Sequence, residues 1–443
     1  MHHDNKQGGG ISAGTRSAFP PVFWVANIIE VLERFAYYGI YFGFGIYLTH
    51  LGYSRDQLGI IQSLFLLLSY ALPLISGTFA DRYGFKKVLI ISYLAYLPSI
   101  LLLMLTKSFS GIALTMLSIG FAAGIFKPLI AGTVRVTTDR SNKTLGFGIF
   151  YAMVNIGGSF GPIVAGKLRA ISWNHAFLAS AIAIGIMLLI TILFYKEPPR
   201  QLEGESLSKK FRDIAIVLSD AKFAAFLVLL GLFFWLPFWA FFNLCAIYVD
   251  SNIDTARLYL DIRSIFGAGF ADFFSQADKD GVRRMLGETI SHTGYIIMIL
   301  QLGISRLFEK IKPMRSFMIG LIIAAVGVGI LGLARSEKGG ASLIFLGIFL
   351  FAIGEMITSP RIQEYITWIA PREKAGLYMG SNFLATMIGG FTSGFLYTSL
   401  SGRCDKAGHP EWVWYIMAAH LVLAAVVFWG FVKVAGDFRE QEA

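Results

Sequence analysis

Charged residues and cysteine are scarce in this sequence. Charged residues make up 15% of its 443 residues, and cysteine occurs only twice. Cys245 lies in an apolar run and Cys404 in a predicted loop, so the pair fits neither a metal site nor a disulfide framework. The chain has no phosphate-binding GxxxxGKS or GxxxxGKT loop, and no nucleophile–base pair or metal-ligand cluster stands out. These absences argue against an enzyme, and the sequence predicts no cofactor and no metal site.

Apolar residues are correspondingly abundant. They account for 55% of the chain, and the mean hydropathy of +0.63 is far from that of a soluble globular protein. Runs long enough to cross about 30 Å of hydrocarbon lie near residues 23–49, 57–80, 88–106, 110–135, 143–169, 175–195, 222–249, 286–308, 313–334, 341–366, 372–400 and 411–435. The sequence therefore predicts an all-α membrane protein with twelve transmembrane helices in two six-helix bundles.

Polar segments divide the chain into regions. The segment KEPPRQLEGESLSKKFRDIA is polar, basic and proline-bearing, as expected of a linker. We predict a cytoplasmic tail at 1–22, an N-terminal bundle at 23–195, a cytoplasmic linker at 196–221, a C-terminal bundle at 222–435 and a cytoplasmic tail at 436–443. An outer insertion at 250–287 mixes apolar and charged residues, which predicts one or two amphipathic helices. Its QADKDG string has Gln276 where the first acidic ligand of a calcium loop should stand and no acid at the twelfth position, so a solvated cap is the better interpretation.

The net charge of +10 comes mostly from lysines and arginines in short, alternate loops between the apolar runs. This pattern is typical of a multi-pass protein whose basic loops face the cytoplasm. No basic helix or aromatic-interleaved patch indicates nucleic acid. We therefore expect a protein of the cell (inner) membrane with both termini cytoplasmic, in contact with lipid and acting as a monomer.

The first apolar run contains the string EVLERFAYYG, which carries unexpected charges. Glu30, Glu33, Arg34, Tyr37 and Tyr38 recur at helical spacing and share one face of the helix. A charge near the centre of a spanning helix costs about 3 kcal/mol, so such a cluster indicates a functional site facing a cavity. The alternative is a purely structural ion-pair network, but apolar packing replaces such networks with little loss of stability.

The loop after the second apolar run reads GTFADRYGFKK and resembles the signature loop of the major facilitator superfamily. The resemblance implies a fold of two six-helix bundles that rock about a central substrate site. It also implies a cytoplasmic conformational latch, in which glycines allow helices to approach closely and charges form contacts. The latch residues would be Gly77, Asp81, Arg82, Lys86 and Lys87.

Several strings resemble one family within that superfamily, the proton-dependent oligopeptide transporters. EVLERFAYYG is similar to its ExxERFxYYG motif, and YALPLISGTFADRYG, GIFKP, FYAMVNIGGSFGP and GEMITSPRIQEYITWIAP are similar to its second, fourth, fifth and tenth helices. The resemblance implies a proton-coupled symporter that imports di- and tripeptides by alternating access. The substrate-binding residues it implies, together with two residues at pocket positions that depart from the family pattern, are Arg34, Tyr37, Tyr38, Tyr70, Lys127, Asn155, Glu355, Ser359, Asn243 and Asn382.

The chemistry of a short peptide agrees with this set. A peptide is a zwitterion, so its site needs a cationic pole, for which Arg34 and Lys127 are available, and an anionic pole, for which Glu355 is available. Coupling to protons, the expected coupling ion, is assigned to Glu30, Glu33, Arg34 and Lys127. Protonating either glutamate would release Arg34 for the carboxylate of the substrate.

Three positions, in helices seven and eleven of the family, depart from the family pattern and leave the substrate open. Asn243 and Leu244 stand where helix seven of the family has an acid and a glutamine, and Asn382 stands at a tryptophan position of helix eleven. The outer gate is therefore expected to lack one protonation switch. A proton-linked transporter of another small charged solute, such as a modified amino acid, nitrate or a drug-like anion, is the alternative. A non-transporting sensor or scaffold is a third possibility, which would predict no uptake.

Overall fold

Helices dominate the architecture. The computed structural model describes residues 18–139, 142–198, 206–334, 340–370 and 375–435. The first half of the chain forms α1 (Pro21–His50), α2 (Arg55–Ala71), α3 (Pro73–Tyr83), α4 (Phe85–Leu105), α5 (Phe109–Val136), α6 (Lys143–Ile171) and α7 (Trp173–Phe194). Helices α2 and α3 meet at an angle of 43° where Pro73 begins α3, and together they make one span. Pro73 removes a backbone donor there, which accounts for the bend.

The second half repeats this plan with more interruptions. It contains α9 (Ala221–Leu230), η1 (Gly231–Trp235) and α10 (Leu236–Asn252) as one span, followed by α13 (Gly287–Ile290), α14 (Gly294–Phe308), α15 (Pro313–Leu333), α16 (Leu343–Ile369), α17 (Ala375–Ser393), η3 (Gly394–Thr398), α18 (Ser399–Lys406) and α19 (Trp412–Ala435). Here η1 and η3 are single π-helical turns inside longer helices. The twelve predicted spans are confirmed, with ends that differ by a few residues.

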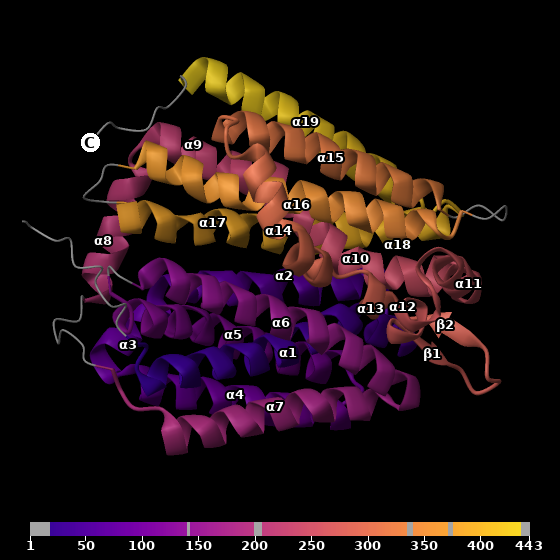
Figure 1. Ribbon diagram of the computed structural model, residues 1–443, viewed down its shortest axis with the longest axis horizontal. Helices are drawn as coiled ribbons and strands as arrows, with labels where there is room; N and C mark the ends of the chain where they lie inside the picture. The colour runs from indigo at the N-terminus through magenta and orange to yellow at the C-terminus, as the bar shows by residue number, and fades with distance from the viewer. Residues whose placement is uncertain (1–17, 140–141, 199–205, 335–339, 371–374, 436–443) are drawn as a thin grey trace, which may run out of the picture.

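Two further segments mark the two ends of the molecule. Helix α8 (Leu207–Leu218) connects the bundles at one end, which we call the linker end. At the opposite cap end lie α11 (Thr255–Phe266), α12 (Ala268–Phe273), β1 (Ser275–Ala277) and β2 (Arg283–Met285), which together form the cap (Figure 1). The insertion was predicted to be helical only, but it also contains a hairpin in which Ser275 pairs with Met285.

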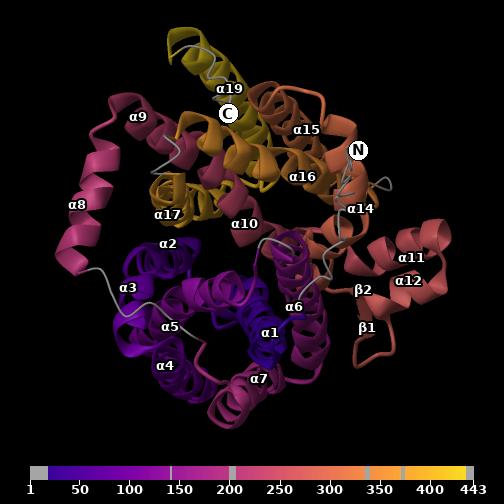
Figure 2. The same cartoon turned by 60° about the vertical axis from the view of Figure 1, so that its left-hand side comes forward.

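Each half has its own apolar core, and the halves meet along one interface. One buried cluster is centred on α1, α2, α4 and α5, and a second on α10, α15, α16 and α19. Figure 2 shows the two groups of helices facing each other, with α1, α2 and α6 opposite α10, α14 and α17. Among the described residues, nine helices are long and apolar enough to cross a membrane, or up to ten if α2 and α3 count as one. Helix α1 is also long enough to cross a membrane, but it carries the charged cluster and is not among these helices.

The halves approach closely where α2 crosses η3. A Cβ atom built on Gly59 would lie 2.4 Å from the carbonyl oxygen of Gly394, and one built on Gly394 would lie 2.4 Å from the carbonyl oxygen of Gly59. Both glycines lie toward the cap end of their spans. A side chain at either position must therefore separate the two backbones.

We expect Gly59→Val to prevent full closure of the cap end, because its side chain would occupy the space of the Gly394 peptide. Paired spin labels at the cap end of α2 and at α18 should report a longer mean distance than in the wild type. Gly77→Val is the matched control, since a Cβ atom at Gly77 meets nothing within 4 Å. An unchanged distance in Gly59→Val would contradict this interpretation of the crossing.

Candidate functional site

A cavity of about 240 Å³ lies between the two halves. The rings that line it come from both halves: Tyr38, Tyr41, Phe42, Tyr70, Trp235, Trp239 and Phe242. The polar side chains in its wall are those of Asn155, His292, Thr293 and Glu355. A largely aromatic cavity with a few polar groups is the usual form of a small-molecule site.

Glu355 supplies the carboxylate of the described cavity wall. It lies near the middle of α16, and Thr293 Oγ1 donates a hydrogen bond of 2.8 Å to its Oε2 atom. Thr293 belongs to a short non-helical break, residues 291–293, between α13 and α14. Because the break frees Thr293 from the helix, its hydroxyl can hold Glu355 toward the cavity. The sequence placed Glu355 at the site but not Thr293.

The charged cluster of α1 assembles as a buried set of ion pairs. The Nε atom of Arg34 lies 3.0 Å from Oε1 of Glu30, and its Nη2 atom lies 2.7 Å from Oε2 of Glu33. The hydroxyl of Tyr96 approaches Glu33 at 3.4 Å. Glu33 is fully buried and Arg34 is 6% exposed. In this conformation the guanidinium is thus occupied by two carboxylates.

Lys127 lies one layer behind the cavity wall. Its Nζ atom donates to the carbonyl oxygen of Ser69 at 3.2 Å and lies 3.9 Å from the ring centroid of Tyr70, a cation–π contact. Tyr70 lines the cavity, whereas neither Lys127 nor Arg34 belongs to its described wall. The Glu355 carboxylate therefore faces the cavity directly, and the Lys127 ammonium group is separated from it by the Tyr70 ring.

The remaining predicted binding residues divide between wall and interior. Asn155 and Tyr38 line the cavity, and the Asn155 amide donates to the carbonyl oxygen of Tyr151 at 2.8 Å. Tyr37 is buried beneath the wall, stacked on Tyr41. Ser359 and Asn382 are outside the described wall.

Asn243, which we predicted to bind substrate, is not among the residues of the described cavity wall. It is buried where α1 and α2 meet α10, in a group of hydrogen bonds that we call the seal. Tyr41 donates to Asn243 Oδ1, and Asn243 Nδ2 donates to Ser393 Oγ at 3.0 Å. Gln62 Nε2 approaches the Asn243 carbonyl oxygen at 3.3 Å. The side chain thus links the two halves.

Further hydrogen bonds extend the seal toward the cap end. Thr398 donates to Gln62 Oε1 at 2.7 Å, and the backbone N–H of Phe395 donates to Ser63 Oγ at 2.9 Å. Each of these bonds joins α2 to η3. The seal consists of uncharged groups, so its bonds can break and re-form without leaving a buried charge.

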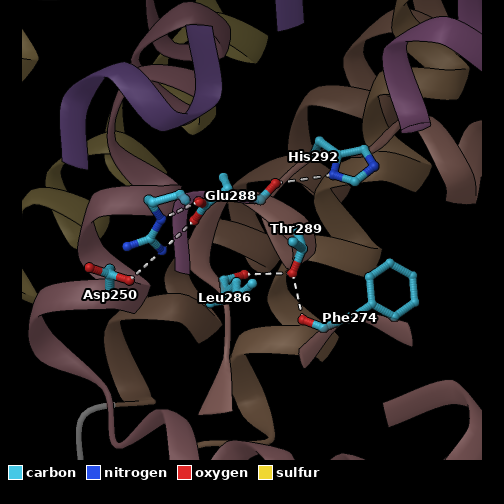
Figure 3. A network of polar contacts seen from close by, with 7 residues as sticks. Asp250, Phe274, Leu286, Glu288, Thr289 and His292 are labelled. Atoms are coloured by element: carbon cyan, nitrogen blue, oxygen red, sulfur yellow. Dashed lines mark hydrogen bonds and ion pairs between the residues drawn. The ribbon is translucent and has the colours of Figure 1, made fainter. Parts of the chain in front are cut away.

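A charged contact closes the cap end beside the seal. The guanidinium of Arg169, on α6, binds both oxygens of Glu288 on α13, with Nη2 at 2.7 Å from Oε2. The same Nη2 atom lies 3.0 Å from Asp250 Oδ1 at the end of α10. Figure 3 shows Glu288 and Asp250 converging on this one guanidinium, with His292 one turn beyond Glu288. We call Arg169, Asp250 and Glu288 the cap-end latch.

Close packing brings the cap-end latch together. A Cβ atom on Gly166 would meet Thr289 Cγ2 at 2.7 Å and Glu288 Cγ at 3.0 Å, so α6 and α13 are in direct contact there. A second ion pair between the halves, Arg55 with Asp405 at 3.4 Å, lies at the same end and is more exposed. Both pairs join helices of different halves, so the structure is closed at the cap end.

The predicted latch residues lie at the linker end, and several of their contacts are described. Gly77 has open space around it, so it does not mediate a close helix approach. Glu197, at the start of the linker, accepts hydrogen bonds from the backbone N–H groups of Phe85 (2.7 Å) and Lys86 (2.9 Å) at the start of α4. Lys86 Nζ donates to the carbonyl oxygen of Ile192 on α7. These contacts stay within the first half and its linker.

The other predicted latch residues are on the surface of the same half. Arg82 and Lys87 are exposed, and Arg82 lies over the ring of Tyr83 at 5.3 Å. Asp81 is also exposed and takes part in a polar interaction. Within the described ranges, no group of three or more histidine, cysteine, aspartate or glutamate residues is arranged to hold a metal ion.

Comparison with protein families finds a match to the Major Facilitator Superfamily over residues 26–393. An uncharacterised MFS-type transporter of Bacillus subtilis, YqjV, is 20% identical over 91% of this chain and 92% of its own length. A Na⁺, Li⁺, K⁺/H⁺ antiporter of Planococcus maritimus is 21% identical over 85% and 88%. The quinolone resistance protein NorA of Staphylococcus aureus is 25% identical over 52% and 60%.

Solved structures with the same fold include two transporters of different kinds. The nucleoside transporter NupG superposes with a TM-score of 0.74 at 15% identity, covering 93% of this chain and 99% of its own. A POT family transporter in complex with a thioalcohol-conjugated peptide also gives 0.74, at 18% identity over 94% and 96%. At these identities the likeness establishes the fold.

Proposed function

Because this chain belongs to the Major Facilitator Superfamily, we propose that it is a proton-coupled symporter that imports di- and tripeptides by alternating access. The observation that carries the proposal is the position of Glu355, a carboxylate held toward an aromatic cavity between the two halves. The position-by-position resemblance of EVLERFAYYG and its companion strings to the oligopeptide transporters points to the same substrate class. The shared fold of a POT family transporter with a bound peptide conjugate is consistent with it.

The cavity can accept the two ends of a peptide in turn. The amino terminus would bind Glu355 between aromatic rings, where a cation is favoured. Rotation of Tyr70 would then open a path from the cavity to Lys127, which could bind the carboxylate of the peptide. Asn155 has both a donor and an acceptor for the peptide bond. Binding would bridge the halves, because Glu355 and Lys127 belong to different bundles.

Proton coupling would use the excess of carboxylates over guanidinium groups around Arg34. Two carboxylates, those of Glu30 and Glu33, share this guanidinium. A proton taken up by either glutamate leaves Arg34 with one anionic partner and a free edge for the substrate. Loss of the proton restores both ion pairs and favours release.

The closed cap end suggests the direction in which the cavity opens. If the linker end faces the cytoplasm, as the basic loops indicate, this conformation faces inward. Both termini would then be cytoplasmic in a protein of the cell (inner) membrane. We propose that one chain suffices, because both poles and the cavity come from a single chain.

The deciding experiment is competition in proteoliposomes with an imposed inward proton gradient. Unlabelled dipeptides should displace a labelled dipeptide, and collapsing the gradient should abolish its accumulation. If no dipeptide competes while the protein remains folded, peptide transport is excluded.

We expect Lys127→Ala to reduce both carboxylate recognition and gradient-driven accumulation of dipeptides. The change removes the cation that Tyr70 separates from the cavity, and Glu30 and Glu33 then lack one of the positive charges near them. Uptake at several pH values should be compared for a dipeptide and its carboxyl-amidated form. Lys107→Ala is a control, since Lys107 contacts Tyr47 at the cap end. Wild-type accumulation in Lys127→Ala would assign Lys127 a structural role.

One observation favours a second candidate function. The described wall of the cavity combines a single carboxylate with many aromatic rings and does not include Arg34 or Lys127. This lining suits an organic cation at least as well as a zwitterion. A proton-linked transporter of another small charged solute is therefore the alternative, and a labelled, membrane-impermeant organic cation such as benzyltrimethylammonium is a suitable probe in the same proteoliposomes. Gradient-driven accumulation of this cation without accumulation of the labelled dipeptide would favour the alternative.

A further inference from the structure

The eighth span is unusually short in its regular part. Helix α14 has 15 residues, which corresponds to about 22 Å at 1.5 Å per residue, whereas the hydrocarbon core is about 30 Å thick. Toward the cap end it is continued by the break at 291–293 and by α13. All four residues of α13 are buried. Some other segment must therefore form the outward surface at this end of the eighth span.

The cap occupies that position. Thr289 of α13 donates a hydrogen bond of 2.7 Å to the carbonyl oxygen of Phe274, just after α12. Figure 2 shows α11, α12 and the hairpin at the periphery of the molecule, beside α6 and α14 rather than over the centre. The cap therefore covers the outer side of α13, at the rim of the helix bundle.

Residues 265–273, from the end of α11 to the end of α12, contact the outward faces of two spans, and we call this segment the α11–α12 turn. The rings of Phe266 and Phe270 lie 5.0 and 6.0 Å from that of Phe345, in the first turn of α16. On the other side, Lys167 of α6 lies 5.6 Å from the ring of Phe273. The turn thus bridges α6 and α16 at the depth where the spans begin.

Large apolar side chains of this turn are exposed on the surface of the protein. Ile265 is 61% exposed, Phe266 47% and Phe273 43%. They lie beside the apolar outer surface of α16, where Phe345 contacts Phe266 and Phe270 and the adjacent Leu346 is also exposed. Contiguous exposed apolar surface of this kind marks an interaction site.

We propose that the α11–α12 turn is embedded in the membrane leaflet at the cap end, with Ile265, Phe266 and Phe273 among the lipid acyl chains. Continuity with the outward surface of α16, through the ring contacts with Phe345, identifies lipid as the occupant. The exposed guanidinium group of Arg263 on α11 has the chemistry to bind lipid phosphates. In this arrangement the cap completes the wall that the short eighth span leaves open.

The hairpin of the same cap is polar and provides an internal contrast. Arg284 Nε donates to Asp278 Oδ2 at 2.9 Å, and this hydrogen bond holds the pKa of Asp278 below its usual range. The carboxylate therefore remains charged, as expected in water. Val282 beside it is apolar and 42% exposed, similar to Phe273.

Depth-dependent quenching in nanodiscs tests the proposal without knowledge of the transported solute. Single cysteines are introduced as Phe266→Cys, Phe273→Cys and Val282→Cys in a background in which Cys245 and Cys404 are replaced by alanine, and each is labelled with an environment-sensitive fluorophore. We expect brominated acyl chains to quench positions 266 and 273 several-fold more than position 282. Aqueous iodide should show the opposite order.

Equal access of iodide to all three positions would overturn the proposal, as would the absence of quenching by brominated lipid at 266 and 273. If labelling perturbs folding, hydrogen exchange of the unmodified protein replaces it. Backbone amides of residues 262–273 should exchange more slowly in nanodiscs than after transfer to a short-chain detergent, while those of 278–283 should not change. No difference between the two media at 262–273 would also overturn it.

Discussion

Replacing Glu355 with glutamine is expected to weaken the binding of peptides with a free amino terminus by about 100-fold. Losing one partner of a desolvated charge pair costs on the order of 3 kcal/mol, and each 1.4 kcal/mol is a factor of ten in affinity. Glutamine keeps the size of the side chain and can still accept the hydrogen bond from Thr293. The variant therefore removes the charge while leaving the cavity wall in place. Competition binding at fixed pH measures the effect directly.

The matched control on the same helix is Glu364→Gln. Glu364 lies nearer the linker end of α16 and pairs with Arg361, three residues before it. It does not belong to the described cavity wall, so its replacement should leave peptide affinity unchanged. Amino-acetylated peptides, which lack the cation, should bind the wild type and Glu355→Gln equally weakly. A similar loss of affinity for free and acetylated peptides would contradict the assignment of Glu355 as the anionic pole.

The second large effect is expected from Glu288→Gln, which should shift the protein toward a conformation that is open at the cap end. Glu288 is 1% exposed and shares the Arg169 guanidinium with the more exposed Asp250. Removing its charge weakens the cap-end latch, and a cost of about 2 kcal/mol would shift the populations roughly thirtyfold. Spin labels at Asn174 and Lys279, on opposite sides of the latch, should report a longer distance.

Asp405→Asn provides the comparison for the latch. It also removes a carboxylate from an ion pair between the halves, but Asp405 is 34% exposed at its side chain and its partner Arg55 is at 3.4 Å. Exposed pairs contribute between 0 and about 1 kcal/mol, so this variant should shift the distance distribution little. If both variants open the cap end equally, Glu288 contributes no more to closure of the cap end than Asp405 does. If neither does, the uncharged seal alone holds the cap end closed.

Periodicity and composition were enough to predict the fold. Twelve apolar runs, a polar linker and basic alternate loops predicted the helices with small errors at their ends, because a membrane leaves few options for an apolar segment of that length. The hairpin in the cap was missed. Its strands have three residues each, too few for an alternating pattern to be recognised.

The site was predictable where a residue type is costly to bury. Glu30, Glu33 and Arg34 could be assigned to one buried cluster because each would be unstable in lipid alone. Asn243 could not be assigned in the same way. An uncharged amide is stable both in a cavity wall and in a hydrogen-bonded interface. Only the positions of Tyr41 and Ser393 show that Asn243 belongs to the interface.

The separation of Lys127 from the cavity by Tyr70 was also beyond the sequence. Helical spacing shows which residues share a face, but it does not show which of two side chains from different helices lies in front. Thr293 is a different case. The string SHTG is a polar interruption within the predicted span 286–308, and that interruption was a usable signal for a broken helix next to a binding site.

The uncharged seal has a consequence for electrical measurements. A gating step that carries one elementary charge across the membrane field responds to voltage by about 2.3 kcal/mol per 100 mV. The seal between Gln62, Asn243, Ser393 and Thr398 carries no charge, and the ion pairs of Arg169 and Arg55 beside it are at the cap-end rim of the spans. Closing and opening this end should therefore be nearly electroneutral, so any voltage dependence of turnover would arise from the charged groups and the solute in the central cavity.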